Sequence, residues 1–340
     1  MTRTVQPFDA VLLISFGGPE GQSDIRPFLR NVLRGRRIPE ARIEAVAKHY
    51  ELFGGVSPLN AITRRQADGL RKRLQESGPR LPVFIGMRNW HPFLDDTLAQ
   101  MADAGIERAL GIILAAQHSY SSCGQYRQNI TDARLSIQSA GHRDIEIHYV
   151  GGWHTHPGFI QANVDHIATA QSSLPSDVRD GARIIFTAHS IPSSMAQDCR
   201  YERDLQESAR SVAKQLGTEN WELVYQSRSG RPDDPWLEPD ICDYLRDQKD
   251  HGLTAAVIAP IGFVADHIEV LYDLDTEAAE VCQTLEIPMA RAAAVNDHPA
   301  FIDMLGALTR GMYQRAERGR LLPISTDSPP ARTEGPPPAR

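Results

Sequence analysis

The sequence contains no apolar run of about 18 residues, the length that a transmembrane helix needs. Its N-terminal segment also lacks the apolar core of a signal peptide. We therefore expect a cytoplasmic protein that is not an integral membrane protein. The 4 cysteines are scattered, with no Cys-x-x-Cys pair, so they predict neither a disulfide framework nor a cysteine metal site. We expect all of them to be small buried apolar residues, namely Cys123, Cys199, Cys242 and Cys282.

Several common functional motifs are missing as well. No Gly-x-x-x-x-Gly-Lys-Ser/Thr segment occurs, which argues against nucleotide hydrolysis. In Phe-Gly-Gly-Pro (16–19), Pro19 removes an amide that would bind a phosphate group. Ser190 stands in Ala-His-Ser-Ile-Pro, which is not the Gly-x-Ser-x-Gly turn of an α/β-hydrolase. The net charge of −7 argues against a nucleic-acid partner.

The composition that remains is ordinary for a globular protein, with 41% hydrophobic and 23% charged residues in 340. Short β-branched runs alternate with longer amphipathic patterns. The runs predict strands at 10–15, 83–86, 110–115, 145–150, 183–187, 222–226, 254–261 and 288–292. Helices are expected between them, including 64–74, 95–104, 204–216 and 299–316. This order predicts an α/β protein with two Rossmann-like domains, each a parallel sheet flanked by helices.

The two groups of strands predict one domain in residues 1–150 and another in residues 151–292. Residues 320–340 are rich in Pro, Ser and Arg, and we expect them to form a disordered tail.

Chemically active side chains follow the expected strands of both halves. The strand ends carry Gly-Met-Arg-Asn-Trp-His-Pro (86–92), Gln-His-Ser-Tyr-Ser-Ser (117–122), Gly-Gly-Trp-His (151–154), Ala-His-Ser-Ile-Pro (188–192) and Gln-Ser-Arg-Ser-Gly (226–230). Parallel sheets bind ligands beyond the carboxyl ends of their strands. The sequence therefore predicts an active-site cleft between the two domains.

An acidic stretch follows the expected strand at 254–261. Glu269, Asp273 and Glu277 are spaced four residues apart, so a helix would stack their carboxylates on one side. Like charges repel in that arrangement unless they share a cation or a proton. A solvated acidic helix face is the alternative interpretation of the spacing alone.

These motifs together resemble the ferrochelatase family. The resemblance is carried by Phe-Thr-Ala-His-Ser-Ile-Pro (186–192), Tyr-Gln-Ser-Arg (225–228) with Pro-Trp-Leu-Glu-Pro (235–239), and Gly-Phe-Val-Ala-Asp-His-Ile-Glu (262–269). Phe-Gly-Gly-Pro-Glu (16–20), Gly-Gly-Val-Ser-Pro (54–58) and residues 86–92 are similar to the same family in the same order. The similarity covers residues 9 to 310.

The resemblance implies a porphyrin cleft between two Rossmann-like domains, with a C-terminal helix (293–318) joining the first domain. It also implies insertion of Fe²⁺, a substrate, into a porphyrin during haem biosynthesis. His189 and Glu269 match the catalytic positions, and the expected metal ligands are His189, Glu269, Asp273 and Glu277. A neutral imidazole can accept a pyrrole proton or bind the metal, and the sequence leaves both roles of His189 open.

The porphyrin contacts rest on separate arguments. Ser57 and Tyr126 match family positions that contact the tetrapyrrole. Arg34 is a candidate partner for a porphyrin carboxylate by its charge, with a solvated surface arginine as the alternative. Phe16 is expected to pack on the face of the macrocycle.

The sequence around Phe16 and Tyr126 is most similar to that of the soluble branch of the family, which uses coproporphyrin III. The segment after Arg310 has no cysteine, so we expect no iron–sulfur cluster and no permanently bound cofactor. We also expect a monomer. The alternatives are a protoporphyrin IX ferrochelatase, a cobalt chelatase of an early tetrapyrrole, and a non-catalytic haem carrier, which has no use for the acidic stretch.

Overall fold

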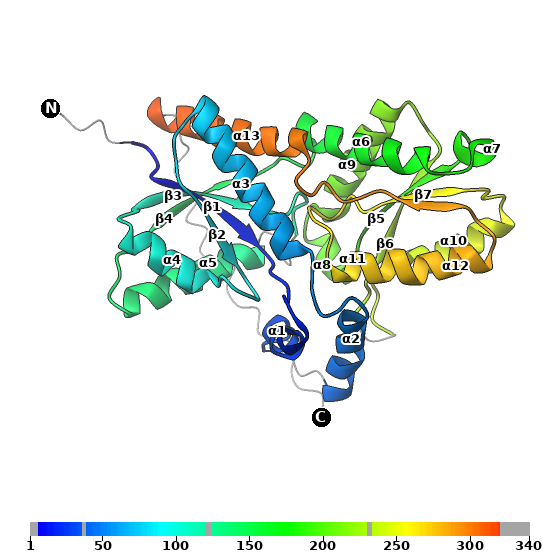
Figure 1. The fold of residues 1–340 in the computed structure, drawn as a ribbon, viewed down its shortest axis with the longest axis horizontal. Coiled ribbons are helices and arrows are strands. Elements are labelled where there is room, and N and C mark those ends of the chain that lie inside the picture. The colour runs from blue at the N-terminus through cyan, green and yellow to red at the C-terminus, as the bar shows by residue number, and fades with distance from the viewer. Residues whose placement is uncertain (1–5, 36–38, 120–123, 230–232, 320–340) are drawn as a thin grey trace.

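The computed structural model describes residues 6–35, 39–119, 124–229 and 233–319, and it contains two parallel sheets that lie side by side (Figure 1). The first sheet has the order β2-β1-β3-β4, formed by Val83–Met87, Ala10–Ser15, Arg108–Ile113 and Glu146–Val150. The second has the order β6-β5-β7-β8, formed by Trp221–Gln226, Arg183–His189, Ala256–Ala259 and Met289–Arg291. Every expected strand is present, and the expected α/β class is confirmed.

The strands form where the chain can be buried on both faces. All residues of β1 are buried, which is typical of a central parallel strand covered by helices on each side. Val11 and Leu13 pack into the core beside α3 (Leu59–Ser77), whereas Leu12 and Ile14 pack toward α4 (Leu94–Asp103). The alternation of side chains along a strand produces these two layers.

Helices cover both sheets. The remaining helices are α1 (Ile25–Val32), α2 (Glu40–Leu52), α5 (Gln125–Ser139), α6 (Pro157–Ser172), α7 (Ser176–Arg179), α8 (Ser193–Gln197), α9 (Tyr201–Leu216), α10 (Ile241–Asp250), α12 (Ala279–Thr284) and α13 (Pro299–Glu317), with a 3₁₀ turn at Gln22–Asp24. Helix α13, orange in Figure 1, packs along α3 of the first half and α6 of the second half, so the last described helix contacts both halves. The division of the chain at residue 150 stays a prediction, and the expected tail at 320–340 lies outside the described residues.

The acidic stretch corrects one expectation. It was expected to be a regular helix with three stacked carboxylates, but α11 covers only Ile268–Tyr272 and is followed by a π-helix at Asp273–Ala278. A π-helix bonds residue i to i+5, so its wider turn changes the direction of each later side chain. Side chains spaced four apart therefore do not share one regular face here.

Two further expectations concern membrane-spanning helices and the burial of the cysteine side chains. Among the described residues, no helix is both long and apolar enough to cross a membrane. Cys282 is buried as expected, but Cys199, between α8 and α9, and Cys242, in the first turn of α10, are only half-buried. Cys123 lies outside the described residues.

Candidate active site

The site begins at the end of β5, where the strand delivers His189 to the edge of the sheet. The Nδ1 atom of His189 lies 2.5 Å from the carbonyl oxygen of Ser190. A carbonyl oxygen can only accept a hydrogen bond, so Nδ1 carries the proton. In the neutral ring the Nε2 atom therefore keeps a free lone pair. The hydroxyl of Tyr201 donates to the backbone carbonyl of His189 over 3.0 Å and fixes the strand end.

Glu269 faces that lone pair. Its Oε2 atom lies 3.8 Å from Nε2 of His189, and the two side chains are 44% and 35% exposed. The carboxylate stands in the first turn of α11, where the helix dipole favours a negative charge. The structure thus brings together the two residues that were expected to be catalytic, and leaves both accessible to a substrate.

A close backbone contact fixes the relation between these two segments. The amide of Gly262, just after β7, donates to the Thr187 carbonyl over 3.0 Å. A Cβ atom at Gly262 would lie 2.5 Å from the Cβ of Ala188, the residue before His189. Only glycine allows this approach, which holds the segment leading to Glu269 against β5.

Asp273 points to a different partner. The Ser227 hydroxyl and the Gln226 side-chain amide, which donates over 3.1 Å, both bind one carboxylate oxygen of Asp273. Ser227 has a φ of 61°, a left-handed conformation that is strained for a serine and is common at functional sites. Burial, with the charge of Glu269, raises the pKa of Asp273 to about 7, although the two hydrogen bonds oppose the change.

Glu277 points outward. It lines a surface hollow of about 500 Å³ together with Asp240, Cys242, Arg246 and Glu280. Partial burial and the charge of Asp240 raise the pKa of Glu277 above its ordinary value. The three acidic residues therefore have separate surroundings, from His189 at one end to this hollow at the other.

A second hollow, of about 350 Å³, lies on the other side of Asp240. It is lined by Ser190, Tyr225, Arg228, Leu237, Glu238, Pro239, Asp240 and Asp243. Ser190 is the neighbour of His189, so this hollow adjoins the site within the second half.

The His189–Glu269 pair lies where the two halves meet. Ile268, next to Glu269, packs in one cluster with Phe28 and Tyr50 of the first half. The imidazole of His49 stacks on the Tyr272 ring, with 3.7 Å between ring centroids. Burial and the charges of Glu269 and Asp273 raise the pKa of Tyr50. Helix α2 thus contacts the acidic segment directly.

Phe16 and Tyr126 both lie close to Arg88. The guanidinium carbon of Arg88 lies 5.8 Å from the centre of each ring. Phe16 also packs against the clusters that contain Ala265 and Ile268, close to Glu269 in the chain. Tyr126 is 6% exposed, and burial raises the pKa of its hydroxyl to about 12. The structure links these two expected porphyrin contacts through an arginine that the sequence argument missed.

Ser57 and Arg34 have local partners. Ser57 is 4% exposed, and its Oγ accepts from the Leu59 amide at 3.4 Å, at the start of α3. The exposed Arg34 donates to the side chain of Asn31 over 2.9 Å. These contacts give Ser57 a structural role at the start of α3, and the porphyrin contacts of both residues stay predictions.

Other residues near the site were not predicted from the sequence. Arg88 stands in the conspicuous 86–92 segment, and its position after a strand was the available signal. Tyr201 contacts the backbone carbonyl of His189, and Ser227 adopts a left-handed φ. Neither feature can be recognised from the residue type.

Comparison with known proteins identifies the family of the chain. The family model described as Ferrochelatase matches residues 8–312. A Coproporphyrin III ferrochelatase from Streptomyces coelicolor is 47% identical over 310 residues, which cover 87% of this chain and 83% of that protein. A protein named Ferrochelatase from Rhodopirellula baltica is 47% identical over 305 residues, covering 89% of this chain and 86% of that protein. A Coproporphyrin III ferrochelatase from Mycolicibacterium smegmatis is 43% identical over 338 residues, covering 97% and 94%.

Among solved structures, SirB from Bacillus subtilis with Fe³⁺ has a TM-score of 0.56 and 11% identity, covering 92% of this chain and 98% of that one. At this identity the similarity concerns the fold alone, and it agrees with the two parallel sheets. The family model spans both sheets and the segments that carry His189 and Glu269. The chain therefore belongs to the ferrochelatase family, as its motifs predicted.

Proposed function

We propose that this protein inserts Fe²⁺ into coproporphyrin III and yields Fe-coproporphyrin III in haem biosynthesis. The observation that carries the proposal is the pair of accessible side chains, His189 and Glu269, 3.8 Å apart where the two halves meet. The names of relatives from Streptomyces coelicolor and Mycolicibacterium smegmatis support coproporphyrin III as the porphyrin.

The pair fits the proton chemistry of metal insertion. A free-base porphyrin must release two pyrrole protons as Fe²⁺ binds its nitrogens. The free Nε2 lone pair of His189 accepts one of them, while the hydrogen bond from Nδ1 to Ser190 holds the ring in that tautomer. The Glu269 carboxylate stays ionised and attracts the imidazolium that has formed. The second pyrrole proton is accepted after His189 has released the first to water.

The other acidic residues fit a route for the hydrated metal ion. Glu277 lies at a surface hollow, Asp273 is half-buried, and Glu269 stands beside His189. Carboxylate oxygens are suitable ligands for a hydrated divalent cation. Because its pKa is about 7, Asp273 exchanges protons readily at neutral pH and suits the removal of pyrrole protons.

Binding of the macrocycle uses residues of the first half. Phe16 supplies an aromatic face, and Arg88 lies beside it and beside Tyr126. Coproporphyrin III carries four carboxylates, so cationic partners such as Arg88 and the exposed Arg34 suit it. The proposal includes a cytoplasmic monomer without a resident cofactor. It also includes no iron–sulfur cluster, because the described part of the sequence after Arg310 and the segment that follows it contain no cysteine.

The test is anaerobic incubation of the purified protein with coproporphyrin III and Fe²⁺, followed by absorbance. We expect the free-base spectrum to convert to that of the iron complex at a rate proportional to protein concentration. A haem carrier would leave the free-base spectrum unchanged. A cobalt chelatase would convert an early tetrapyrrole with Co²⁺ and leave coproporphyrin III with Fe²⁺ unreacted.

A further inference from the structure

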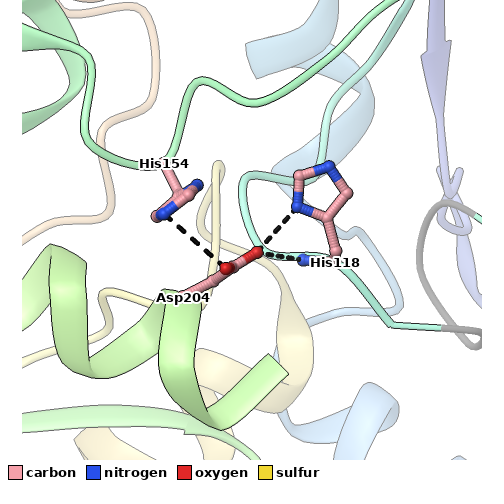
Figure 2. A group of neighbouring side chains, drawn as sticks. All are labelled: His118, His154 and Asp204. Atoms are coloured by element: carbon pink, nitrogen blue, oxygen red, sulfur yellow. Dashed lines mark hydrogen bonds and ion pairs between the residues drawn. The ribbon is translucent and has the colours of Figure 1, made fainter. Parts of the chain in front are cut away.

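Two histidines and a buried aspartate converge away from the proposed catalytic pair (Figure 2). His118 follows β3 of the first sheet, His154 follows β4, and Asp204 lies on α9 beside the second sheet. Figure 2 shows the carboxylate of Asp204 between the two imidazole rings, with one oxygen directed to each. Three separate segments are thus joined at one point.

The distances between the donor atoms are short. His118 Nδ1 lies 2.7 Å from Oδ2 of Asp204, and His154 Nε2 lies 3.7 Å from Oδ1. One nitrogen or oxygen atom from each of the three residues lies within 4.8 Å of the others. Ligand atoms bound to one tetrahedral zinc ion are separated by about 3.3–3.5 Å, given bonds of about 2.0–2.1 Å. To share an ion, the 2.7 Å pair would have to move apart by about 0.6 Å, and atoms separated by up to 4.8 Å would have to approach by up to about 1.4 Å.

Burial makes the cluster unusual. Asp204 is completely buried, and His154 is 5% exposed. The Nδ1 atom of His154 has no hydrogen-bond partner among the described residues, and its Nε2 atom faces two carboxylates. His118 is 38% exposed and leaves the cluster open to solvent on one side. A metal ion can enter from that side.

A fourth oxygen donor lies next to the cluster. Oε2 of Glu207, one turn after Asp204 on α9, lies 2.9 Å from His154 Nε2. Two arginines, Arg200 and Arg203, lie on the outer side of these carboxylates, at 3.3 Å from Asp204 and 3.5 Å from Glu207. Without a metal, these ion pairs and hydrogen bonds satisfy both carboxylates, so a purely structural network is the alternative that a test must exclude.

We propose that His118, His154 and Asp204 form a second metal site, which binds a borderline divalent ion of the Zn²⁺ class. Two imidazoles and a carboxylate are the donors that such ions prefer, and Glu207 or water completes the coordination. Binding replaces the protons that now lie between the rings and the carboxylates, so it releases protons and weakens as pH falls.

The position of the site gives it a consequence for the fold. A bound ion would connect the ends of β3 and β4 in the first half to α9 in the second. Tyr201, one turn before Asp204 on α9, donates to the carbonyl of His189. The ion would thus stabilise the contact between the two halves and the helix that fixes the end of β5.

The experiment must separate this site from the proposed catalytic one. In the Glu269→Gln/Asp273→Asn double variant, stripped with a chelator, we titrate Zn²⁺ by calorimetry and Co²⁺ by visible absorbance. We expect about one tight equivalent, and Co²⁺ absorbance typical of four-coordinate nitrogen and oxygen ligation. Adding His154→Asn to this variant should weaken Zn²⁺ binding by more than about 100-fold. That loss is larger than the usual effect of removing a residue that only hydrogen-bonds to a metal ligand.

His142→Asn is the matched control, because it removes a histidine that lies 3.0 Å from Asp103 elsewhere on the surface. That control should retain the tight equivalent. If His154→Asn fails to fold by circular dichroism, His118→Asn at the half-exposed position replaces it. The proposal is overturned if the double variant binds no tight equivalent, or if it retains the equivalent after either cluster histidine is replaced. Chelation by the wild-type protein, measured separately, reports on the proposed function and not on this site.

Discussion

The Nε2 atom of His189 and the Oε2 atom of Glu269 face each other across 3.8 Å, although they come from the end of β5 and the first turn of α11. The hydrogen bond to Ser190 keeps the imidazole lone pair on the side of the carboxylate. This relationship places a proton acceptor beside an anion at a solvent-accessible position, which suits the removal of a pyrrole proton in the proposed reaction.

Replacing His189 should remove chelation without removing porphyrin binding. We expect His189→Ala to lower the turnover number by about 100- to 10,000-fold, the usual contribution of an acid–base group. The dissociation constant for coproporphyrin III, measured by quenching of porphyrin fluorescence, should change little. Near-normal turnover in this variant would remove His189 from the mechanism.

The acidic residues should differ in their effects, because their surroundings differ. Glu269→Gln removes the carboxylate beside His189 and should lower the maximal rate. Asp273→Asn and Glu277→Gln should mainly raise the Fe²⁺ concentration that gives half-maximal rate. Steady-state kinetics against Fe²⁺ for the three variants provide the comparison. Three wild-type profiles would show that these carboxylates have no role in metal delivery.

The raised pKa of Asp273 predicts how stability depends on pH in the metal-free protein. The folded state holds this proton more tightly than the unfolded chain, so the free energy of unfolding falls as pH rises from about 4 to about 7. Asp273→Asn should therefore be more stable than wild type above pH 7. We expect its free energy of unfolding to exceed that of wild type by about 2 kcal/mol. This is half of the value that the pKa change from 3.8 to about 7 corresponds to, because water reaches the half-buried carboxylate.

Urea unfolding in the presence of a chelator measures this difference at several pH values. The two proteins should have the same stability at about pH 3 and below, well under the unfolded-state pKa of 3.8, where Asp273 is mostly protonated in both states. A difference that is constant across the whole pH range would rule out titration of Asp273 as its cause.

Gly262→Ala tests the close approach beside His189. The added Cβ would lie 2.5 Å from the Ala188 Cβ and 2.7 Å from its Cα, so the backbone must move. We expect a loss of about 1–3 kcal/mol in the free energy of unfolding, typical of overpacking, together with a reduced turnover number. Gly311→Ala in α13 is the control, since its Cβ would meet no atom within 4 Å. That variant should gain about 0.5–1 kcal/mol by helix propensity, and equal stabilities for the two variants would refute the steric argument.

Much of the fold was predictable because the sequences of buried parallel strands are short apolar runs. The run at 10–15 coincides with β1, and the other expected strands differ from the observed ones by two residues or fewer at either end. The apolar run at 254–261 was too long, because its last residues, Pro260 and Ile261, are buried in the turn after β7 without pairing in the sheet.

The site was less predictable, because its details depend on tertiary contacts. The spacing of Glu269, Asp273 and Glu277 is compatible with an α-helix, and nothing in residue type distinguishes a π-helix that begins at Asp273. Ser227 acts through a left-handed φ. The meeting of His118, His154 and Asp204 requires the folded arrangement of two sheets, although both histidines stood in strand-end segments that the sequence had singled out.

The most direct test of the account is a competition between porphyrins. Equal concentrations of coproporphyrin III and protoporphyrin IX are incubated anaerobically with the protein and limiting Fe²⁺ in the same detergent, and the iron porphyrins are separated by chromatography. The account predicts that Fe-coproporphyrin III forms faster and is the main product. A main product of Fe-protoporphyrin IX, or no iron porphyrin above the protein-free control, would contradict it.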